Sequence, residues 1–525
     1  MLTPSAIPAG GEGVRRRLGG HPSPIVKGIR KSFIVAQSLN VWFVASEVAP
    51  YAKTGGLADV AGSLPDALRR IGVDISVALP LYRAVKETGL DAQPLLKNLT
   101  VPVGDTRISC DVWSATTGAG VPVLLFDYPP YFERPGLYGS ARGDYPDNLE
   151  RFSLLCRGAL VLAQELGTPP DVFHCHDWQT ALIPAYLKTR YRDDPFFRRV
   201  ASLFTIHNMG YQGIFPVQGL AVCGLPAAAF HMEGVEYWGD MSLLKAGIVY
   251  ADALTTVSPT YSREIQTPEF GLGMDGVLRR RSDSLFGILN GADYTVWNPA
   301  TDPHIASPFT PTDRQGKRAC KAALLDEAGL AQRLLDRPIC AVVSRLTVQK
   351  GYELIVKAAD QIVDMDAGLV ILGSGEPAYQ RAVAALKRKY PTRVAVWFGF
   401  DEPLAHRITA GSDILWVPSL YEPCGLTQIH AMKYGTVPVV RATGGLDDTI
   451  DPFDPQSGEG TGFKFYGHKS RDFVKEIRRA VRLYEDPATW ERIMDNDMAA
   501  DFSWDRSARR YRALYEQLRR EQTAA

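Results

Sequence analysis

The sequence predicts an α/β protein with two doubly wound domains. Short apolar runs of strand length alternate with helix-like stretches, as in parallel sheets covered by helices. The alternation stops in a Pro- and Thr-rich stretch, residues 298–313, and then starts again. With 525 residues, the chain is also too long for a single core. We therefore expect domains at 40–297 and 314–490, a linker between them, and a final segment at 491–525.

In the first predicted domain, β-branched and aromatic residues are frequent in the apolar runs, as is typical of strands. Stretches such as 59–70 and 152–166 have the composition of helices. The expected strands are 41–45, 73–78, 121–126, 171–174, 202–206 and 253–257.

The second predicted domain repeats this order. An amphipathic helix is expected at 352–363 and a last, basic helix at 504–519. The expected strands are 339–343, 369–372, 394–398, 414–417 and 437–440.

Composition and charge exclude several classes of protein. Hydrophobic residues make up 46% and charged residues 22%, which is ordinary for a globular chain. The 58 basic and 58 acidic residues cancel, so there is no overall field to bind nucleic acid or an anionic membrane. No apolar run reaches the roughly 20 residues of a membrane span. The seven scattered cysteines, without a CxxC pair, favour reduced thiols and a cytoplasmic location.

Residues 1–39 are basic, rich in Gly and Pro, and without periodicity. Three interpretations are open. The segment is a disordered extension, or the protein starts near Ser38, or the segment is an organelle transit peptide that directs the protein to a plastid.

One pattern, TGGLxD, occurs twice, at 54–59 and at 443–448, each time between an expected strand and an expected helix. Ligands of parallel sheets bind at the carboxyl ends of strands, where glycines allow close approach and helix starts offer free N–H groups. We therefore expect two copies of one loop, facing each other across a cleft, each serving its own ligand. Only the first copy follows a lysine, Lys53, whereas Ala442 precedes the second.

A second motif, SRLTVQKG at 344–351, also follows an expected strand. Arg345 and Lys350 are five residues apart, so both heads can converge on one anion such as a diphosphate. The alternative is a pair of solvated surface cations.

A third motif, EPCGLTQ at 422–428, follows another strand, and Pro423 forces the chain to turn. Residues 425–427 open a helix whose start can take phosphate, and Glu422 can bind sugar hydroxyls. Cys424 has no neighbouring base, which argues against a nucleophilic role.

Two further strand ends carry polar groups. The stretch HCHDW, 174–178, would need a fourth ligand to hold a metal, so Asp177 is better interpreted as an acceptor of sugar hydroxyls. His207, in TIHNMGYQG, is by itself most often a structural histidine. Residues 373–375 lack the third glycine of a dinucleotide fingerprint, which disfavours a dehydrogenase.

Together and in this order, the motifs resemble the bacterial glycogen synthase and plant starch synthase family, over residues 40–515. The stretches that carry the resemblance are 47–60 (EVAPYAKTGGLADV), 174–178, 205–213, 289–293 (LNGAD), 344–351, 422–428 and 443–448.

The resemblance implies a GT-B fold: two Rossmann-like domains facing across a cleft, with the C-terminal helix returning to the first domain. It implies transfer of glucose from ADP-glucose to the 4-hydroxyl group at the non-reducing end of an α-1,4-glucan, with retention and without metal or other cofactor. The implied catalytic residues are Glu422, Arg345, Lys350, Asp177 and His207. The implied nucleotide-sugar contacts are Lys53, Gly55, Gly56, Asn290, Arg345, Lys350, Cys424, Gly425, Leu426 and Thr427.

Two alternatives remain beside this reading. One is a GT-B transferase that uses UDP-glucose. The other is a non-catalytic glucan-binding homologue, which would be expected to lack one of the four charged residues Lys53, Arg345, Lys350 and Glu422. His430 stands where wider relatives often have a second glutamate, so no residue is assigned to the ribose. No oligomeric state is indicated.

Overall fold

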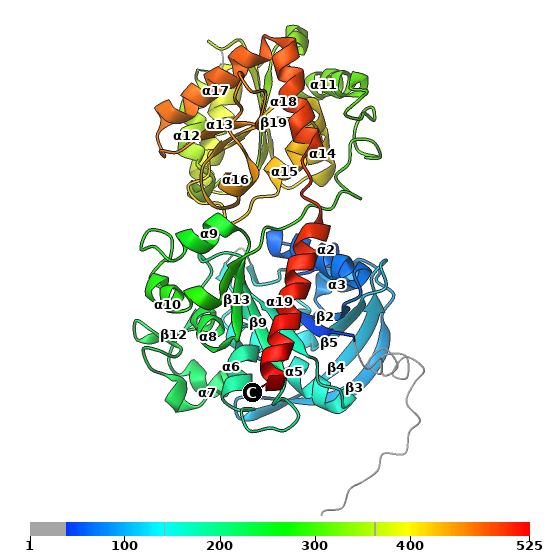
Figure 1. Cartoon of the computed structure of the whole chain (residues 1–525), viewed down its shortest axis with the longest axis vertical. Coiled ribbons are helices and arrows are strands. Elements are labelled where there is room, and N and C mark those ends of the chain that lie inside the picture. Colours follow the sequence, from blue (N-terminus) through cyan, green and yellow to red (C-terminus); the bar gives the residue numbers. More distant parts are fainter. Residues whose placement is uncertain (1–37, 141, 362–363, 525) are drawn as a thin grey trace, which may run out of the picture.

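The computed structural model describes residues 38–140, 142–361 and 364–524, which form two α/β domains stacked end to end (Figure 1). The predicted extension at 1–39 lies outside the described residues except for its last two, and so does the end of the helix predicted at 352–363. The two doubly wound domains confirm the predicted fold class.

The N-terminal domain is built on a nine-stranded sheet with the order β14-β13-β9-β8-β1-β2-β5-β4-β3. Strands β14 to β5 are parallel, and β1, β2, β8 and β9 are buried along their whole length, which explains their uninterrupted apolar runs. The strands are β1 (Asn40–Val44), β2 (Asp74–Pro80), β3 (Gln93–Val103), β4 (Thr106–Thr116), β5 (Pro122–Asp127), β8 (Val172–His176), β9 (Ala201–Ile206), β13 (Ala253–Thr256) and β14 (Leu285–Gly287).

The hairpin of β3 and β4 was not predicted. It pairs antiparallel with β5 at the edge of the sheet, and its outer face is exposed. Two register shifts near Leu96 interrupt the alternation of buried and exposed residues that marks such strands. Short strands also form small sheets beside the main one: β6 (Gly139–Ser140), β7 (Gly143–Asp144), β10 (Ile214–Phe215), β11 (Glu236–Tyr237) and β12 (Asp240–Ser242).

Helices cover this sheet, and several of them begin at the edge that faces the second domain. They are α2 (Gly56–Arg70), α3 (Arg83–Glu87), α4 (Pro129–Phe132), α5 (Asn148–Leu166), α6 (Leu182–Lys188), α7 (Gly219–Cys223), α8 (Leu243–Tyr250), α9 (Pro259–Glu264) and α10 (Asp275–Arg280).

The C-terminal domain contains a six-stranded, fully parallel sheet with the order β17-β16-β15-β18-β19-β20. The strand order reverses between β15 and β18, which is where doubly wound sheets bind ligands. The strands are β15 (Ile339–Val343), β16 (Gly368–Gly373), β17 (Val394–Phe398), β18 (Ile414–Val417), β19 (Val437–Arg441) and β20 (Phe463–Phe465). The helices are α11 (Gln315–Ala328), α12 (Tyr352–Ala359), α13 (Pro377–Lys389), α14 (Glu402–Gly411), α15 (Thr427–Lys433), α16 (Gly444–Thr449), α17 (Ser470–Tyr484) and α18 (Pro487–Ala499).

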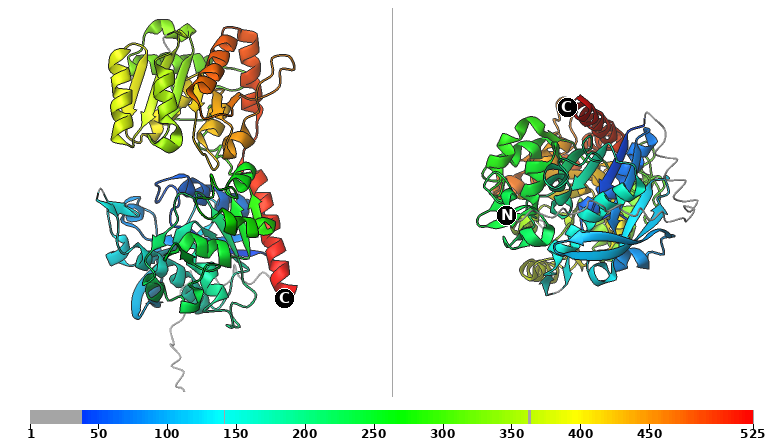
Figure 2. Two further views of the ribbon diagram at one scale, coloured as in Figure 1. Left: turned by 90° about the vertical axis from the view of Figure 1, so that its left-hand side faces the viewer. Right: turned by 90° about the horizontal axis from the view of Figure 1, so that it is seen from below.

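The chain crosses between the domains twice. The segment 298–313 is packed on the C-terminal domain, because the buried carboxylate of Asp302 accepts hydrogen bonds from His406 Nδ1 at 2.7 Å and Tyr434 OH at 2.5 Å. Helix α18 runs through residue 490 and packs on α15 and α17. The second crossing follows at 500–503, and α19 (Trp504–Ala524) then lies along the N-terminal domain, against α2, β8 and β9 (Figures 1 and 2).

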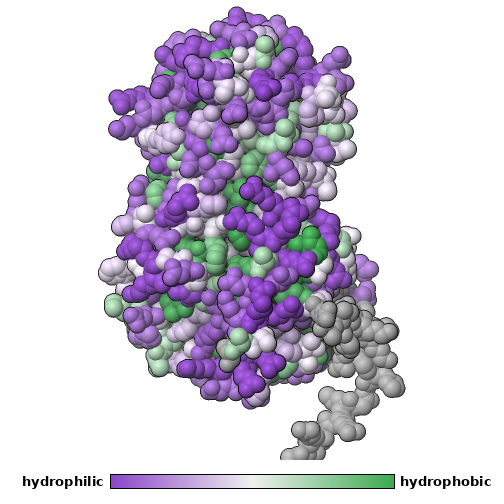
Figure 3. Space-filling view, in the orientation of Figure 1, coloured by the Kyte–Doolittle hydropathy of each residue, from purple (hydrophilic) through white to green (hydrophobic). Residues whose placement is uncertain are grey.

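The face that carries α19 is mostly hydrophilic, with hydrophobic residues showing at the waist between the domains and on the lower domain (Figure 3). Within the described residues, no helix combines the length and the apolar character that a bilayer crossing requires. All seven cysteines are buried free thiols.

Candidate functional site

A cavity of about 590 Å³ lies between the two domains. Its wall on one side is the first TGGLxD loop of the N-terminal domain. On the other side it is formed by the loops that follow β15, β16 and β17 and by the start of α15. The predicted residues that line it are Lys53, Gly55, Gly56, Arg345, Lys350, Leu426 and Thr427.

A buried carboxylate, Glu47, shapes the first TGGLxD loop. Its Oε2 accepts hydrogen bonds from the backbone N–H groups of Thr54 at 2.5 Å and Gly55 at 3.1 Å. Its Oε1 accepts from the hydroxyl groups of Thr54 and Tyr138, both at 2.6 Å. These bonds cap the start of α2. A β-carbon on Gly55 or Gly56 would meet no other atom within 4 Å, so the glycine edge of the loop is open for a ligand.

Lys53 reaches across the cavity from the first domain. Its Nζ lies 2.7 Å from Asp59 Oδ1, the aspartate of the same TGGLxD motif, and 5.9 Å from the ring centroid of Phe400 in the second domain. Burial raises the pKa of Asp59, and the charge of Lys53 opposes that shift. An anion bound in the cavity would therefore meet a cation that one carboxylate already orients.

The second domain supplies an ion pair at its strand-order reversal. Lys350, after β15, donates from Nζ to Glu422 Oε2, after β18, at 2.5 Å. The hydroxyl of Ser419 donates to the same oxygen at 3.1 Å. Glu422 is only 6% exposed, so its charge depends on these donors. Lys350 lines the cavity, whereas Glu422 is not among the described lining residues and contacts the cavity wall through this ion pair.

Arg345 connects the two domains at the cavity. Its Nη1 donates to Tyr211 OH, from the TIHNMGYQG loop of the first domain, at 3.2 Å, and its Nη2 donates to Gln349 at 3.3 Å. Lys350 is half-buried in its ion pair, whereas Arg345 is exposed and makes two long hydrogen bonds, so solvation remains the alternative for Arg345. Both line the cavity, as an anion site requires.

Only the last part of the EPCGLTQ loop lines the cavity. Leu426 and Thr427 line it, whereas Cys424 and Gly425 are not among the described lining residues. Burial raises the pKa of the Cys424 thiol to about 12, so the group stays protonated, which argues against a nucleophile. Gly425 has a φ of +71°, which favours glycine, and it lets the chain turn into α15.

Asp177 and His207 lie at the ends of β8 and β9, beside the strand-order reversal of the first sheet. Asp177 has an unusual φ of +54°, and its Oδ1 accepts a hydrogen bond from His207 N at 2.7 Å. Burial raises the pKa of Asp177 to about 7 and lowers that of His207 to about 3. The imidazole is therefore neutral near pH 7. Neither residue is among the described residues that line the 590 Å³ cavity.

The remaining histidines of HCHDW take part in packing. His174 shares hydrogen bonds of 2.7 Å with Tyr515 OH of α19 and with Thr205 Oγ1, and His176 Nδ1 lies 3.0 Å from His207 Nε2. Across the described ranges, no group of three or more His, Cys, Asp or Glu side chains could hold a metal ion.

Asn290 is buried next to Cys424, away from the cavity wall, and its Oδ1 has no hydrogen-bond partner among the described residues. The following Gly291 packs on α19: a β-carbon there would lie 2.6 Å from Trp504 Cα. The C-terminal helix therefore fixes the loop that carries Asn290.

Several lining residues were missed by the sequence analysis. The ring of Trp297 is stacked between His406 and His430, with centroid distances of 3.7 and 4.1 Å, and Trp297 and His430 line the cavity. Both faces of Trp297 are covered by the two histidines, so a nucleobase or a sugar ring could stack only on the outer face of His430. No local motif marks this stack, because its three rings come from distant segments. Exposed Phe400, which also lines the cavity, was missed as well.

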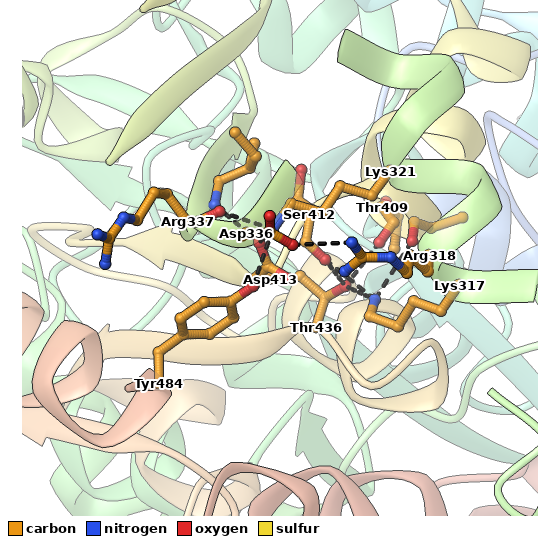
Figure 4. A network of polar contacts seen from close by, with 12 residues as sticks. Lys317, Arg318, Lys321, Asp336, Arg337, Thr409, Ser412, Asp413, Thr436 and Tyr484 are labelled. Carbon is orange, nitrogen blue, oxygen red and sulfur yellow. Dashed lines mark hydrogen bonds and ion pairs between the residues drawn. The ribbon is translucent and has the colours of Figure 1, made fainter. Parts of the chain in front are cut away.

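A second cavity, of about 600 Å³, lies within the C-terminal domain among α11, α17 and α18. Figure 4 shows the network of polar contacts around Lys317, Lys321 and Asp413, which line this cavity. Its buried cations are already occupied. Lys317 Nζ donates to Tyr434 O at 2.8 Å and Thr436 Oγ1 at 2.9 Å, among others, and Lys321 pairs with Asp413 at 2.7 Å. No described residue of the N-terminal domain lines it. It therefore fits a transfer reaction between domains less well.

The second TGGLxD loop does not behave as expected. None of residues 443–448 is among the described residues that line the 590 Å³ cavity. The loop faces α9 of the N-terminal domain instead. The expectation that each copy serves its own ligand is therefore wrong for the second copy.

Comparisons with known proteins show the family of this chain. The family model described as the starch synthase catalytic domain matches residues 40–280, and the one described as glycosyl transferases group 1 matches 331–495. A glycogen synthase from Koribacter versatilis is 46% identical over 478 residues, which cover 91% of this chain and 98% of that protein. One from Syntrophotalea carbinolica is 46% identical over 479 residues, with the same coverage.

Solved structures show the same likeness. The catalytic domain of starch synthase IV from Arabidopsis thaliana, bound to ADP and acarbose, superposes with a TM-score of 0.86 at 34% identity and covers 92% of this chain and 100% of its own. A sucrose-phosphate synthase from Thermosynechococcus elongatus has a TM-score of 0.55 at 19% identity, covering 91% of this chain and 99% of its own, and is similar in fold alone.

Proposed function

This chain belongs to the family of bacterial glycogen synthases and plant starch synthases, and we propose that it transfers glucose from ADP-glucose to the 4-hydroxyl group at the non-reducing end of an α-1,4-glucan, with retention of the anomeric configuration. The chain has the GT-B fold of glycosyltransferases. One observation carries the proposal: Lys53 of one domain and Arg345 and Lys350 of the other line a single interdomain cavity.

The reaction needs stabilisation of a leaving diphosphate. The bond between glucose C1 and the β-phosphate oxygen breaks, and its electron pair leaves with ADP. The bond between C1 and the acceptor O4 forms, and the proton of that hydroxyl passes to the departing phosphate. Fixed cations stabilise the growing negative charge more in the transition state than in the ground state. We assign this task to Arg345 and Lys350, with Lys53 acting from the opposite wall.

The sugar carries positive charge in the transition state and favours oxygen acceptors nearby. Glu422 can supply one from the donor domain, held in place by Lys350 and Ser419. Asp177 and the neutral His207 can supply acceptors from the other domain. We infer same-face attack rather than a covalent glycosyl-enzyme, since Glu422 is already bound by a cation and a hydroxyl group and is not among the described residues that line the cavity.

Two observations support an adenine nucleotide and a glucan as ligands. The starch synthase of 34% identity was solved with ADP and acarbose. In this chain, His430, which stacks on Trp297, lines the cavity and can contact the base or a sugar ring. We propose a cytoplasmic location on the basis of seven free thiols.

The alternatives are less well supported. A non-catalytic homologue would be expected to lose a charged residue of the cavity. Lys53, Arg345 and Lys350 all line it, and Glu422 is paired with Lys350. A donor preference for UDP-glucose would leave the fold and the charge stabilisation unchanged.

The proposal is tested by glycogen elongation with ADP-glucose and UDP-glucose in parallel, in the presence of a chelator. Faster transfer from ADP-glucose, with an α-1,4-linked product, is the expected result. Transfer from UDP-glucose alone would replace the proposed donor. Binding of glycogen without transfer from either donor would favour the non-catalytic homologue.

A further inference from the structure

The second TGGLxD loop and helix α9 bind each other across the domain boundary. Glu264, at the end of α9, accepts hydrogen bonds at Oε1 from Thr443 Oγ1 at 2.9 Å and from Gly444 N at 3.1 Å. In return, Asp448 of α16 accepts from Thr260 N at 2.8 Å and from Thr260 Oγ1 at 2.7 Å. Each domain therefore holds the first turn of a helix of the other. We call these five residues, Thr260, Glu264, Thr443, Gly444 and Asp448, the interdomain clamp.

The clamp has the properties of a strong contact. Both acceptors are carboxylates, and hydrogen bonds to ionised groups are about twice as strong as neutral ones. Thr443 is 1% and Thr260 9% exposed, so water has little access to the donors. Arg263 adds a donor to Thr260 Oγ1 at 2.8 Å. The negative charge of Asp448 and Glu264 also lies at helix starts, where the dipole favours it.

On the side of the second domain, the clamp continues into the loop of Glu422. The N–H of Gly445 donates to the backbone oxygens of Glu422 at 3.0 Å and Pro423 at 3.2 Å. A β-carbon on Gly444 would lie 1.9 Å from Glu422 O, and one on Gly445 would lie 2.1 Å from Cys424 O. The backbone of Gly444 and Gly445 packs directly against the backbone of the Glu422 loop. A shift of the clamp would therefore move Glu422.

On the side of the first domain, α9 is tied to the loop of His207. The N–H of Met209, two residues after His207, donates to Tyr261 OH at 3.1 Å. Tyr261 is 1% exposed, so this contact is rigidly packed. Helix α9 therefore contacts one half of the site with Tyr261 and the other half with Thr260 and Glu264.

We propose that Glu264 and Asp448 are positioning residues of the transfer reaction. They set the Glu422 loop of the C-terminal domain against the Asp177 and His207 loops of the N-terminal domain, without touching the substrate. This inference rests on the proposed function for its catalytic readout, but the geometry that it predicts can be measured without catalysis.

The test compares Glu264→Ala and Asp448→Ala with a matched control, Asp486→Ala. Asp486 caps α18 by the same chemistry, accepting from Thr489 Oγ1 at 2.6 Å and from Thr489 N at 3.5 Å, but entirely within one domain. We expect kcat to fall roughly ten- to a hundredfold in the clamp variants, as loss of charge-assisted hydrogen bonds does. The control should keep the wild-type kcat.

Two further readouts separate positioning from general damage. The dissociation constant for ADP, measured by calorimetry, should change by less than about threefold, because the second domain supplies most of the cavity wall. Small-angle X-ray scattering of the nucleotide-free protein should show a larger radius of gyration in the clamp variants than in the control. Glu264→Gln, which keeps an acceptor oxygen, should recover part of the lost kcat and serves if Glu264→Ala does not fold.

Wild-type kcat in folded Glu264→Ala and Asp448→Ala would overturn the proposal, and so would an equal loss in Asp486→Ala. If the wild-type protein transfers no glucose, the proposed function fails, and the scattering comparison alone decides whether the clamp fixes the domains. In that comparison, an unchanged radius of gyration would overturn the clamp as well.

Discussion

The two TGGLxD loops make the same hydrogen bonds with carboxylates of different origin. In the first, Glu47 of the same loop accepts from the hydroxyl of Thr54 and from Gly55 N. In the second, Glu264 of the other domain accepts from the corresponding groups of Thr443 and Gly444. The first loop is therefore complete within its domain, whereas the second is completed only when the domains meet.

The glycines of the two loops also face different surroundings. Space is open beside Gly55 and Gly56, whereas backbone oxygens fill the space beside Gly444 and Gly445. In the first copy the missing side chains leave room for a ligand. In the second they leave room for the loop of Glu422. One sequence pattern thus provides one local structure, and the neighbouring elements decide whether it binds a ligand or a domain.

The aspartates at the end of the two TGGLxD motifs also differ, one lying at the cavity and the other at the domain contact. Asp59 pairs with Lys53 at the cavity, and Asp448 binds Thr260 of the other domain. A lysine before the second copy would have no ligand to bind, which accounts for Ala442. The second loop lies outside the cavity that Lys53 lines.

The largest loss of kcat is expected from substitutions of the charged residues that the C-terminal domain contributes to the site. Lys350→Ala and Glu422→Ala should each lower kcat by at least about 100-fold, as loss of one transition-state electrostatic partner does elsewhere. Steady-state glycogen elongation measures this. A kcat near that of the wild type in either folded variant would remove that residue from the mechanism.

The next prediction tests the two environments of the glycines directly. Gly445→Ala should lower the free energy of unfolding by about 2 kcal/mol, because its β-carbon collides with Cys424 O. Gly55→Ala should leave stability within about 0.5 kcal/mol and raise KM for the nucleotide-sugar instead. Urea unfolding and initial rates measure the two quantities. Equal destabilisation by both variants would mean that the loops are not differently packed.

The parts of this protein that could be predicted are those that depend on a short contiguous stretch of sequence. Parallel strands buried on both faces give apolar runs, so β1, β8 and β15 were found, together with the polar residues at their ends. The resemblance implied catalytic roles for Lys350 and Glu422, and both follow strands whose ends meet at one edge of the sheet. Their ion pair was not predicted.

The parts that were missed depend on contacts between distant segments. The stack of Trp297 and His430 and the bond of Glu264 to the second loop join residues more than 100 positions apart. Glu264 lies in a stretch, PTYSRE, without any functional pattern. A repeated motif therefore predicts a repeated local structure, but its partner appears only in three dimensions.

The role of Lys53 can be separated from that of its loop. Lys53→Ala should lower kcat/KM for the nucleotide-sugar about tenfold, since one cation at the cavity is lost while the capping by Glu47 remains. Ala442→Lys should change kcat/KM by less than about twofold, because that position lies outside the cavity. The comparison fails if Ala442→Lys restores activity to Lys53→Ala.

The smallest expected effect is a pH dependence of kcat/KM, which should come from Asp177 of the N-terminal domain and not from Glu422 of the C-terminal domain. Glu422 is paired with Lys350, whereas Asp177 is held by the backbone N–H of His207, and burial raises its pKa to about 7. Ionised Asp177 is the stronger acceptor, both of that hydrogen bond and of one from a sugar hydroxyl group. The ionised fraction, and with it kcat/KM, should therefore rise about fourfold between roughly pH 6.5 and pH 8. Asp177→Asn should be less active and should lose this rise. If the variant keeps the same acid limb, another group titrates there, and the acceptor domain contributes no ionising carboxylate to the reaction.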